Sequence, residues 1–238
     1  METYQAIVVT PVKNSLENTL ATIKAINNSL GSFLYFVYDD FSDESVSETL
    51  KNQAESLNYN YIHLSELTDS PSPNYITVLV DAQQKALAYG LPLIIVESDI
   101  EVENNTFERL LSFCDAHDNI GMVGAITVDH NKEVNFPYLK FKGKKRVPTW
   151  TDRSLSFCCT LLTKDFLEKY PFKNLQKGKD WYDTSISYAS LEQGFKNYIL
   201  LDTPVLHKPH GSRPWKQLKY TNPLKYYWLK FSKGRDKI

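Results

Sequence analysis

The feature that most constrains the fold is a regular alternation of apolar and amphipathic stretches over the first 130 residues. Four short runs are rich in β-branched and aromatic side chains, as buried strands are: residues 6–12, 33–38, 59–64 and 91–96. Between them we expect helices at residues 14–30, 43–57 and 75–89. This strand–helix rhythm predicts an α/β fold with a mostly parallel, Rossmann-like central sheet and helices on both of its faces.

Local signals predict where these elements begin and end. Asn14, with Glu17 three residues later, is typical of a capping box and predicts the start of the first helix. Gly31 and Gly90 predict helix ends, because glycine readily adopts the left-handed conformation that closes a helix. The turn residues of segment 68–74 predict a loop.

Beyond residue 120 the rhythm changes, and the expected strands follow one another more closely. The expected elements are strands at 121–128, 134–141, 155–162 and 198–206, a short helix that Thr163 caps and that ends before Pro171, and a helix at 181–193. No linker rich in Pro, Gly or Ser separates the two halves of the chain. We therefore expect the second half to extend the same sheet.

The composition is that of a globular protein with a sizeable core. Hydrophobic residues make up 42% and charged residues 23% of the 238 residues, which excludes a disordered polyelectrolyte. No apolar run approaches the roughly 20 residues that span a bilayer. The first predicted strand begins within ten residues of Met1, so we expect no signal peptide. Three cysteines without CxxC spacing indicate a reducing compartment. We expect a cytoplasmic protein.

The net charge of −1 conceals a division of charge along the chain. Residues 1–130 carry 19 acidic and 5 basic side chains, whereas residues 131–238 carry 9 acidic and 22 basic ones. The basic half could face nucleic acid, a phosphorylated ligand or an acidic membrane. Alternatively, the two halves neutralise each other within one fold, and we favour this explanation.

Polar and acidic residues gather where the predicted strands end. Thr10 and Pro11 end the first strand, Asp39 and Asp40 the second, and the sequence ESDIE at 97–101 the fourth. In open parallel α/β sheets, ligands bind beyond the carboxyl ends of the strands. We therefore expect a ligand site at this edge of the sheet.

A metal ion is expected at the same edge. The chain has no glycine-rich phosphate loop of the GxGxxG or GxxxxGK[ST] type, so a bound diphosphate would need a cation to neutralise it. Glu97 and Asp99 stand one residue apart directly after a buried strand, where a turn can aim both at one ion. Carboxylate oxygens are the ligands that Mg²⁺ and Mn²⁺ prefer.

These motifs, in this order, resemble those of the family 2 glycosyltransferases, which have the GT-A fold, over about residues 6 to 213. The segments that carry the resemblance are Pro11 to Asn14, Asp39-Asp40-Phe41-Ser42-Asp43, Glu97-Ser98-Asp99, Cys158-Cys159-Thr160, Trp181-Tyr182-Asp183, Glu192-Gln193-Gly194-Phe195-Lys196, and His207 to Ser212. The chain departs from the family pattern at Glu97, which replaces the usual first aspartate. It departs again at Ser185, which stands where relatives often have a second acidic residue.

The resemblance implies transfer of a sugar, with inversion, from a nucleotide diphosphate sugar to an acceptor hydroxyl in glycan or surface polysaccharide synthesis. The acceptor would be a glycan or a lipid-linked acceptor. It also implies a single GT-A domain over residues 1–238. Within it, residues 1–130 bind the nucleotide sugar, 131–213 form the acceptor and catalytic half, and 214–238 form a basic aromatic tail.

The same resemblance assigns a nucleotide site to Thr10, Pro11, Asp39, Asp40 and Ser98. A carboxylate there can accept the N–H groups of a nucleobase. At least one of the two adjacent aspartates is also expected to cap the helix that follows them.

Glu97, Asp99 and His207 are implied as ligands of Mn²⁺ or Mg²⁺, which would act as a Lewis acid on the departing phosphate. His207 follows a strand that should return beside the metal strand. Its neutral imidazole could ligate the ion or donate to the diphosphate, and His210 competes for this role.

Asp183 is the candidate general base, since the first turn of a helix favours an ionised carboxylate. It could accept a proton late, once the attacking hydroxyl has become acidic. Asp180 is the alternative base, and its spacing from Asp183 is equally that of a capping pair. Cys158 and Cys159 are expected to be packing residues without a catalytic role.

Two basic segments remain. Residues 140–146 (KFKGKKR) predict a mobile loop that closes over the diphosphate, meets an anionic acceptor or is merely solvated. The tail at 214–238 suits an anionic membrane, single-stranded nucleic acid or a helix docked through its aromatic side chains. With a lipid-linked acceptor, we expect the tail to contact the inner face of the cell membrane.

Two other functions stay open at this point. A catalytically silent GT-A-like module that only binds a nucleotide or glycan would account for the departures at Glu97 and Ser185. A nucleic-acid-binding protein would use the basic half of the chain, with salt-sensitive affinity. That function leaves the ordered acidic strand ends unexplained, so we expect no nucleic-acid partner.

Overall fold

The computed structural model describes residues 3–175, 181–208 and 222–232. The chain divides into two compact units, residues 1–207 and 208–238. The first unit carries the sheet and the helices around it, and the second carries α8 (Pro223–Ser232). Within these described parts of the chain, no helix is both long enough and apolar enough to cross a bilayer.

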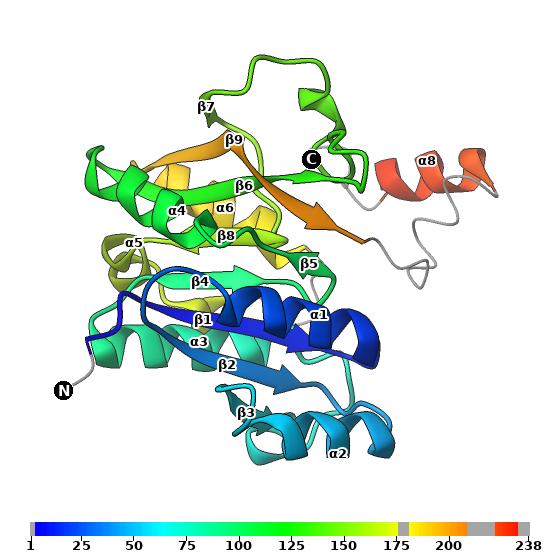
Figure 1. The fold of residues 1–238 in the computed structure, drawn as a ribbon. Helices are drawn as coiled ribbons and strands as arrows, with labels where there is room; N and C mark the ends of the chain where they lie inside the picture. Colours follow the sequence, from blue (N-terminus) through cyan, green and yellow to red (C-terminus); the bar gives the residue numbers. More distant parts are fainter. Residues whose placement is uncertain (1–2, 176–180, 209–221, 233–238) are drawn as a thin grey trace. The chain divides into compact units, whose positions relative to one another are not determined.

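One sheet of nine strands runs through the described part of the first unit (Figure 1). The strand order is β3-β2-β1-β4-β8-β6-β9-β5, and β7 also pairs with β9. The first four strands in this order are parallel, β8 is antiparallel to both of its neighbours, and β6 is parallel to β9. The bounds are β1 (Ala6–Val12), β2 (Phe33–Asp39), β3 (Asn60–His63), β4 (Leu93–Val96), β5 (Ile100–Glu101), β6 (Ile120–Val128), β7 (Pro148–Thr151), β8 (Cys159–Leu162) and β9 (Lys196–His207).

Helices cover both faces of this sheet (Figure 1). On one face lie α1 (Leu16–Asn27), α2 (Glu44–Gln53) and α4 (Thr106–Asp115); on the other lie α3 (Tyr75–Tyr89), α5 (Lys164–Lys169) and α6 (Tyr182–Glu192). Short 3₁₀ turns occur at Leu64–Glu66, Leu139–Phe141 and Phe172–Asn174. The architecture is the expected α/β fold with helices on both faces.

Alternate side chains of β1 explain why the sheet is covered on both sides. Ile7 and Val9 pack in the cluster shared with α3, whereas Val8 and Val12 pack in the cluster shared with α1. All four are buried. Burial of each such side chain stabilises the folded protein by about 1.5–3 kcal/mol. This core therefore fixes the positions of the carboxyl ends of the central strands.

Several predicted element ends are confirmed. Gly90 ends α3 in the left-handed conformation with φ 67°. Thr163 is the N-cap of α5, and its hydroxyl accepts a hydrogen bond from the backbone N–H of Phe166. The first helix ends earlier than expected, at Asn27, before Gly31.

The predicted N-cap at Asn14 is wrong. The N-cap is Ser15, whose φ is 57° and whose side chain makes no capping hydrogen bond. The Asn14 side chain instead accepts a hydrogen bond from the backbone N–H of Asp43 at 2.8 Å. The backbone N–H of Asn14 donates to the Ser42 hydroxyl, also at 2.8 Å. Asn14 therefore ties the loop after β1 to the loop after β2, instead of capping its own helix.

The predicted strand at 134–141 is also wrong. Val134 forms only an isolated bridge with Val128, and a 3₁₀ turn occupies Leu139–Phe141. Pro137 cannot donate a backbone hydrogen bond, and the carbonyl of Phe136 accepts from the Thr127 hydroxyl at 3.1 Å. The segment therefore folds back over β6 as a loop.

Three elements were not predicted: α4, β5 and β7. The helix α4 does carry a helical signal, with apolar residues at 107, 110, 111 and 114. The strands β5 and β7 have two and four residues, too few for a periodic pattern. Both pair with β9, which lies far away in the sequence.

Candidate active site

The turn after β4 places its carboxylates beside the end of β9. The backbone N–H of Ile100 donates to the carbonyl of Glu97 at 3.2 Å, which closes the turn, and β5 begins at Ile100. Antiparallel pairing then sets Ile100 opposite His207. The Oδ2 atom of Asp99 lies 3.5 Å from Nε2 of His207, and both side chains are buried. His207 thus lies beside the turn that follows β4, although β9 pairs with β5, β6 and β7 and the partners of β4 are β1 and β8.

The contacts of His207 indicate which of its two ring nitrogen atoms carries the proton when the ring is neutral. Its Nδ1 atom lies 2.6 Å from the carbonyl oxygen of Phe136. Because a carbonyl only accepts hydrogen bonds, Nδ1 carries the proton. In the neutral ring, Nε2 is then unprotonated and can ligate a metal ion, an arrangement that metal-binding histidines commonly show. The side chain of Asn135 donates to the carbonyl of His207 at 3.0 Å and so secures the end of β9.

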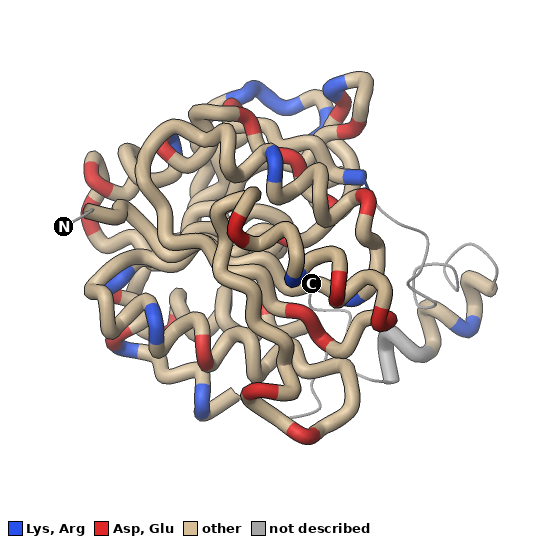
Figure 2. The backbone as a smooth tube through the Cα atoms, turned by 60° about the horizontal axis from the view of Figure 1, so that its bottom comes forward, with Lys and Arg blue, Asp and Glu red and all other residues tan. Residues whose placement is uncertain are grey.

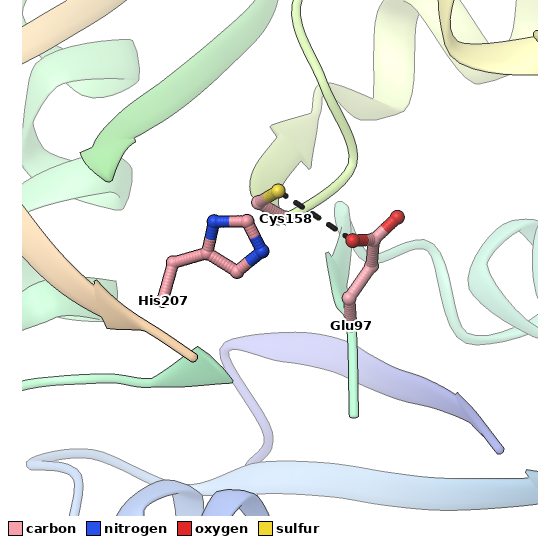
Figure 3. Close-up of side chains that lie close together, drawn as sticks. All are labelled: Glu97, Cys158 and His207. Carbon is pink, nitrogen blue, oxygen red and sulfur yellow. Dashed lines mark hydrogen bonds between the residues drawn. The ribbon is translucent and has the colours of Figure 1, made fainter. Parts of the chain in front are cut away.

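Cys158 is a neighbour of this cluster that the sequence did not indicate. The antiparallel pair β4–β8 matches Val96 with Cys159, and the ladder continues one residue further, where the backbone N–H of Glu97 donates to the carbonyl of Cys158 at 3.1 Å. The Cys158 thiol donates to Oε2 of Glu97 at 3.5 Å. Donor atoms of Glu97, Cys158 and His207 lie within 4.8 Å of one another, and Figure 3 shows the three side chains pointing toward a common space.

Burial accounts for the protonation state of this thiol. Burial raises the pKa of Cys158 well above its ordinary value of 9.0, and the nearby carboxylates of Glu97 and Asp99 raise it further. Cys158 therefore carries its proton and acts as a hydrogen-bond donor to Glu97. Its sulfur also lies 3.3 Å from the Ser156 hydroxyl.

Asp40, at the end of β2, binds the loop before α3. Its Oδ2 atom accepts from the Ser72 hydroxyl and from the backbone N–H of Asn74, both at 2.8 Å, and its Oδ1 atom accepts from the Asn74 amide at 2.9 Å. The side chain is 9% exposed. A carboxylate oxygen can accept two hydrogen bonds, so Oδ1 retains capacity for another donor.

Asp39 is fully buried and holds the start of α2. It accepts from the backbone N–H of Ser42 at 3.0 Å, the Ser47 hydroxyl at 2.5 Å and the Tyr61 hydroxyl at 2.7 Å. Burial alone would raise the pKa of Asp39, but these hydrogen bonds outweigh it and lower the pKa below 3.8. The expectation that Asp39 or Asp40 caps this helix is wrong, because the N-cap residue is Asp43. Asp39 instead fastens α2 through Ser47.

The other expected nucleotide-site residues lie at the same edge of the sheet with different exposures. Thr10 is buried within β1, and its hydroxyl accepts from Tyr35 at 2.9 Å. Pro11 is half-buried near the end of β1, and Ser98 lies in the turn after β4 with 9% of its surface exposed.

Asp183 lies in the first turn of α6, as expected. Its Oδ1 atom accepts a hydrogen bond from the backbone N–H of Thr184 at 2.7 Å. The alternative base, Asp180, lies outside the described residues, and so does His210. The N-cap of α6 is Trp181, with φ 85°.

Two tyrosines link the start of α6 to the cluster around Cys158. The ring centroid of Tyr75 lies 6.4 Å from the ring centroids of Tyr182 and Phe157. Tyr182 directly precedes Asp183 in the sequence, and Phe157 directly precedes Cys158. Tyr138 is buried, and its pKa is raised well above 10.0 by burial first and, to a smaller extent, by the Asp183 carboxylate. Its hydroxyl accepts a hydrogen bond at 2.9 Å from the backbone N–H of Ser156, two residues before Cys158.

The basic segment 140–146 forms a surface loop between β6 and β7 (Figure 2). Lys142 pairs with Glu133 at 2.5 Å, and Arg146 donates to the carbonyl of Lys132 at 2.9 Å. The ammonium groups of Lys140 and Lys144 lie 5.0 and 5.3 Å from the centroid of the Phe141 ring. Beside the loop lies a cavity of about 370 Å³ that Lys132, Lys142, Lys144 and Arg146 help to line.

The fold is that of the GT-A glycosyltransferases. Residues 7–171 match the family model described as glycosyl transferase family 2, and the chain belongs to this family. No individual curated protein matches the chain significantly.

Solved glycosyltransferase structures show the same fold at low sequence identity. GalNAc-T7, crystallised with UDP, GalNAc and Mn²⁺, has a TM-score of 0.60 at 13% identity, over 86% of this chain and 44% of its own. Residues 1–349 of TarS from S. aureus give 0.65 at 17% identity, over 86% and 60%. The mannosyltransferase PcManGT from Pyrobaculum calidifontis, in complex with GDP-Man and Mn²⁺, gives 0.66 at 13% identity, over 97% and 65%. The chain therefore spans less than two thirds of each of these chains.

Proposed function

We propose that this protein is an inverting glycosyltransferase that depends on a divalent cation and transfers a sugar from a nucleoside diphosphate sugar to an acceptor hydroxyl. The observation that carries the proposal is the meeting of Glu97, Asp99 and His207 at the carboxyl edge of the sheet. These residues come from segments more than 100 positions apart, and two of them are buried. Membership of the family supports the same activity.

The donor set fits Mn²⁺ or Mg²⁺. Two carboxylates supply the hard oxygen ligands that both ions prefer, and the Nε2 atom of the neutral His207 ring would supply an imidazole ligand beside them. When bound, such an ion neutralises the diphosphate leaving group. GalNAc-T7 and PcManGT were both solved with Mn²⁺ and a nucleotide or nucleotide sugar.

Asp40 is the proposed acceptor for an N–H group of the nucleobase, because its Oδ1 atom, which accepts from the Asn74 amide, retains capacity for a second donor. Asp39 would position the loop beneath it through Ser42 and Ser47. Pro11 and Ser98 would line the same site from β1 and the turn after β4. Thr10 would support it from inside the sheet.

Asp183 is the proposed general base. A single carboxylate that deprotonates the acceptor hydroxyl allows one direct displacement at the anomeric carbon, and one displacement inverts the configuration there. Asp183 lies in the first turn of α6, where the helix dipole favours a negatively charged side chain. Asp180 stays the alternative.

We also propose that the acceptor is a glycan or lipid-linked glycan of surface polysaccharide synthesis, and that the protein works at the inner face of the cell membrane. The basic loop at 140–146 and the exposed aromatic residues of α8 support this proposal. The acidic residues at the carboxyl edge of the sheet give no support to a nucleic-acid partner.

The test is thermal stability with UDP, GDP, dTDP and CMP, each with and without Mn²⁺. A nucleotide at 100 times its dissociation constant should stabilise the protein by about 2.7 kcal/mol. We expect one nucleoside diphosphate to do so only with Mn²⁺, and Asp99→Asn to abolish this effect. Glu103→Gln, an exposed acid of the same segment, is the matched control and should behave like wild type.

Radiolabelled sugar transfer then separates an active enzyme from a silent binding module. Stabilisation without any transfer would favour the silent module. Undiminished Mn²⁺-dependent binding in Asp99→Asn would contradict the proposed metal site.

A further inference from the structure

Cys158 adds a soft donor to a cluster that is otherwise composed of carboxylates and an imidazole (Figure 3). Mn²⁺ and Mg²⁺ have little affinity for a thiol, whereas Zn²⁺ and Cd²⁺ bind thiolates strongly. Cys158 is 2% exposed, and the continuation of the β4–β8 ladder holds it against Glu97.

We propose that this corner also binds a thiophilic divalent cation, with Zn²⁺ as the model case. Cys158, Glu97, His207 and Asp99 would be its ligands, and this ion would inhibit the protein by closing the site. The inhibitory part rests on the proposed function; the binding part does not.

Two of the observed distances match edges of a zinc coordination tetrahedron. A sulfur ligand at about 2.3 Å and an oxygen ligand at about 2.1 Å are separated by about 3.6 Å at the tetrahedral angle, and a nitrogen–oxygen edge measures about 3.4 Å. The observed Cys158 Sγ to Glu97 Oε2 distance is 3.5 Å, and the His207 Nε2 to Asp99 Oδ2 distance is also 3.5 Å. Donor atoms of Glu97, Cys158 and His207 lie within 4.8 Å of one another, so these side chains have to draw closer around an ion, and the Asp99 carboxylate, which is outside this group of three, has to turn toward it.

Binding of such an ion would replace a hydrogen bond with a metal–sulfur bond. The S–H group of Cys158 now donates to Glu97. As the zinc–sulfur bond forms, the thiol proton leaves to the solvent, and the Glu97 oxygen that accepted it becomes a ligand. With Mn²⁺ or Mg²⁺ the thiol keeps its proton and its bond to Glu97.

Four protein ligands would leave no coordination position for the diphosphate. Catalytic zinc sites keep one position open, whereas zinc sites with four protein ligands are closed and structural. An ion held by four protein ligands would therefore exclude the nucleotide diphosphate. We expect Zn²⁺ to weaken Mn²⁺-dependent nucleotide binding at least tenfold.

The experiment uses Co²⁺ as a spectroscopic substitute for Zn²⁺, added to the metal-free full-length chain. A cobalt–thiolate bond gives a charge-transfer band in the near ultraviolet, and added Zn²⁺ should displace it. We expect this band in wild type and in Cys159→Ala, which removes the adjacent buried thiol, and its loss in Cys158→Ala. No band in wild type, or a band that persists in Cys158→Ala, would overturn the proposal.

Two further measurements keep the test decisive. If Cys158→Ala does not fold by circular dichroism, Cys158→Ser replaces it. Independently, X-ray absorption of zinc-loaded wild type should show one sulfur ligand, and a shell of only nitrogen and oxygen would refute the site.

The same samples separate this proposal from the proposed function. A cobalt–thiolate band without any Mn²⁺-dependent nucleotide binding would leave the thiolate site standing and remove the transferase. Nucleotide binding without the band would leave the proposed transferase standing and remove the thiolate site. If both occur but Zn²⁺ does not weaken nucleotide binding, the site exists and its inhibitory role is wrong.

Discussion

At the scale of the residue, the adjacent aspartates Asp39 and Asp40 have different roles because they have different hydrogen-bond partners. Asp39 is fully buried and accepts three hydrogen bonds from the β2–α2 region and β3. Asp40 reaches the surface and accepts from the loop before α3. Strand alternation explains the difference, because successive side chains point to opposite faces of a sheet.

Asp39→Asn should lower the free energy of unfolding by about 1–3 kcal/mol at neutral pH, since the amide cannot accept from three donors as a carboxylate does. The pKa of Asp39 is lower in the folded protein than its ordinary 3.8. Its stabilisation is therefore complete above that value and is lost as the pH falls through the folded pKa. Urea unfolding at neutral pH and at about pH 3 measures both effects.

Asp43→Asn is the control for this prediction. Asp43 is exposed, and its side chain makes no capping hydrogen bond. The expected change is within about 0.5 kcal/mol at either pH. A difference between wild type and Asp39→Asn that stays constant as the pH falls would contradict the assigned role.

Asp183→Asn should reduce the rate of sugar transfer by about 10²- to 10⁴-fold, the usual contribution of a positioned general base. Nucleotide-dependent thermal stabilisation should remain, because Asp183 is not among the proposed donor ligands. Asp165→Asn, an exposed carboxylate in the first turn of α5, is the control and should retain activity. Retained transfer in Asp183→Asn would shift the base assignment to Asp180.

At the scale of the element, β6 depends on two glycines that let other side chains approach it closely. A Cβ atom on Gly121 would lie 2.0 Å from the Ser190 hydroxyl and 2.8 Å from Cβ of Phe195. A Cβ atom on Gly124 would meet Thr160, Tyr138 and Leu155 at 3.2–3.4 Å. The first position tolerates no side chain without movement of α6 or the strand after it.

Gly121→Ala should therefore destabilise the protein by about 1–3 kcal/mol, as overpacking in a core does. Gly124→Ala, on the same strand, should cost less because its contacts are looser. Thermal or urea unfolding of both variants checks the order. Equal stability of the two would show that Ser190 and Phe195 move aside without cost.

At the scale of the whole molecule, an ion pair between Arg109 and Asp202, at 2.6 Å, joins the acidic half of the chain to the basic half. It pairs a base of the acidic half with an acid of the basic half. The 22 basic side chains of residues 131–238, against 9 acidic ones, are the reason to test an anionic partner.

We expect the full-length protein to float with vesicles that contain anionic lipids and not with neutral ones. Replacing Leu224 and Trp228 of α8, which are 85% and 67% exposed, with alanine should weaken this binding. Trp150→Ala, an exposed tryptophan of the first unit, is the control. Flotation that neither depends on anionic lipid nor changes in the double variant would contradict membrane contact through the tail.

The sequence alone determined the order and type of most elements. The apolar periods of β1, β2, α3 and β4 predict these elements nearly to their ends, because each period reflects a local backbone repeat. The acidic residues at the ends of β2 and β4 were predicted to lie at one edge of the sheet, because the carboxyl ends of parallel strands lie on the same side.

Tertiary structure alone decided which distant residues meet at that edge. The bond between Cys158 and Glu97 follows from the register of β8 on β4, and the approach of His207 to Asp99 follows from the pairing of β9 with β5. Likewise, Asn14 ties two loops together instead of capping a helix. Such pairings depend on the burial of many side chains at once, and no local periodicity of the sequence contains them.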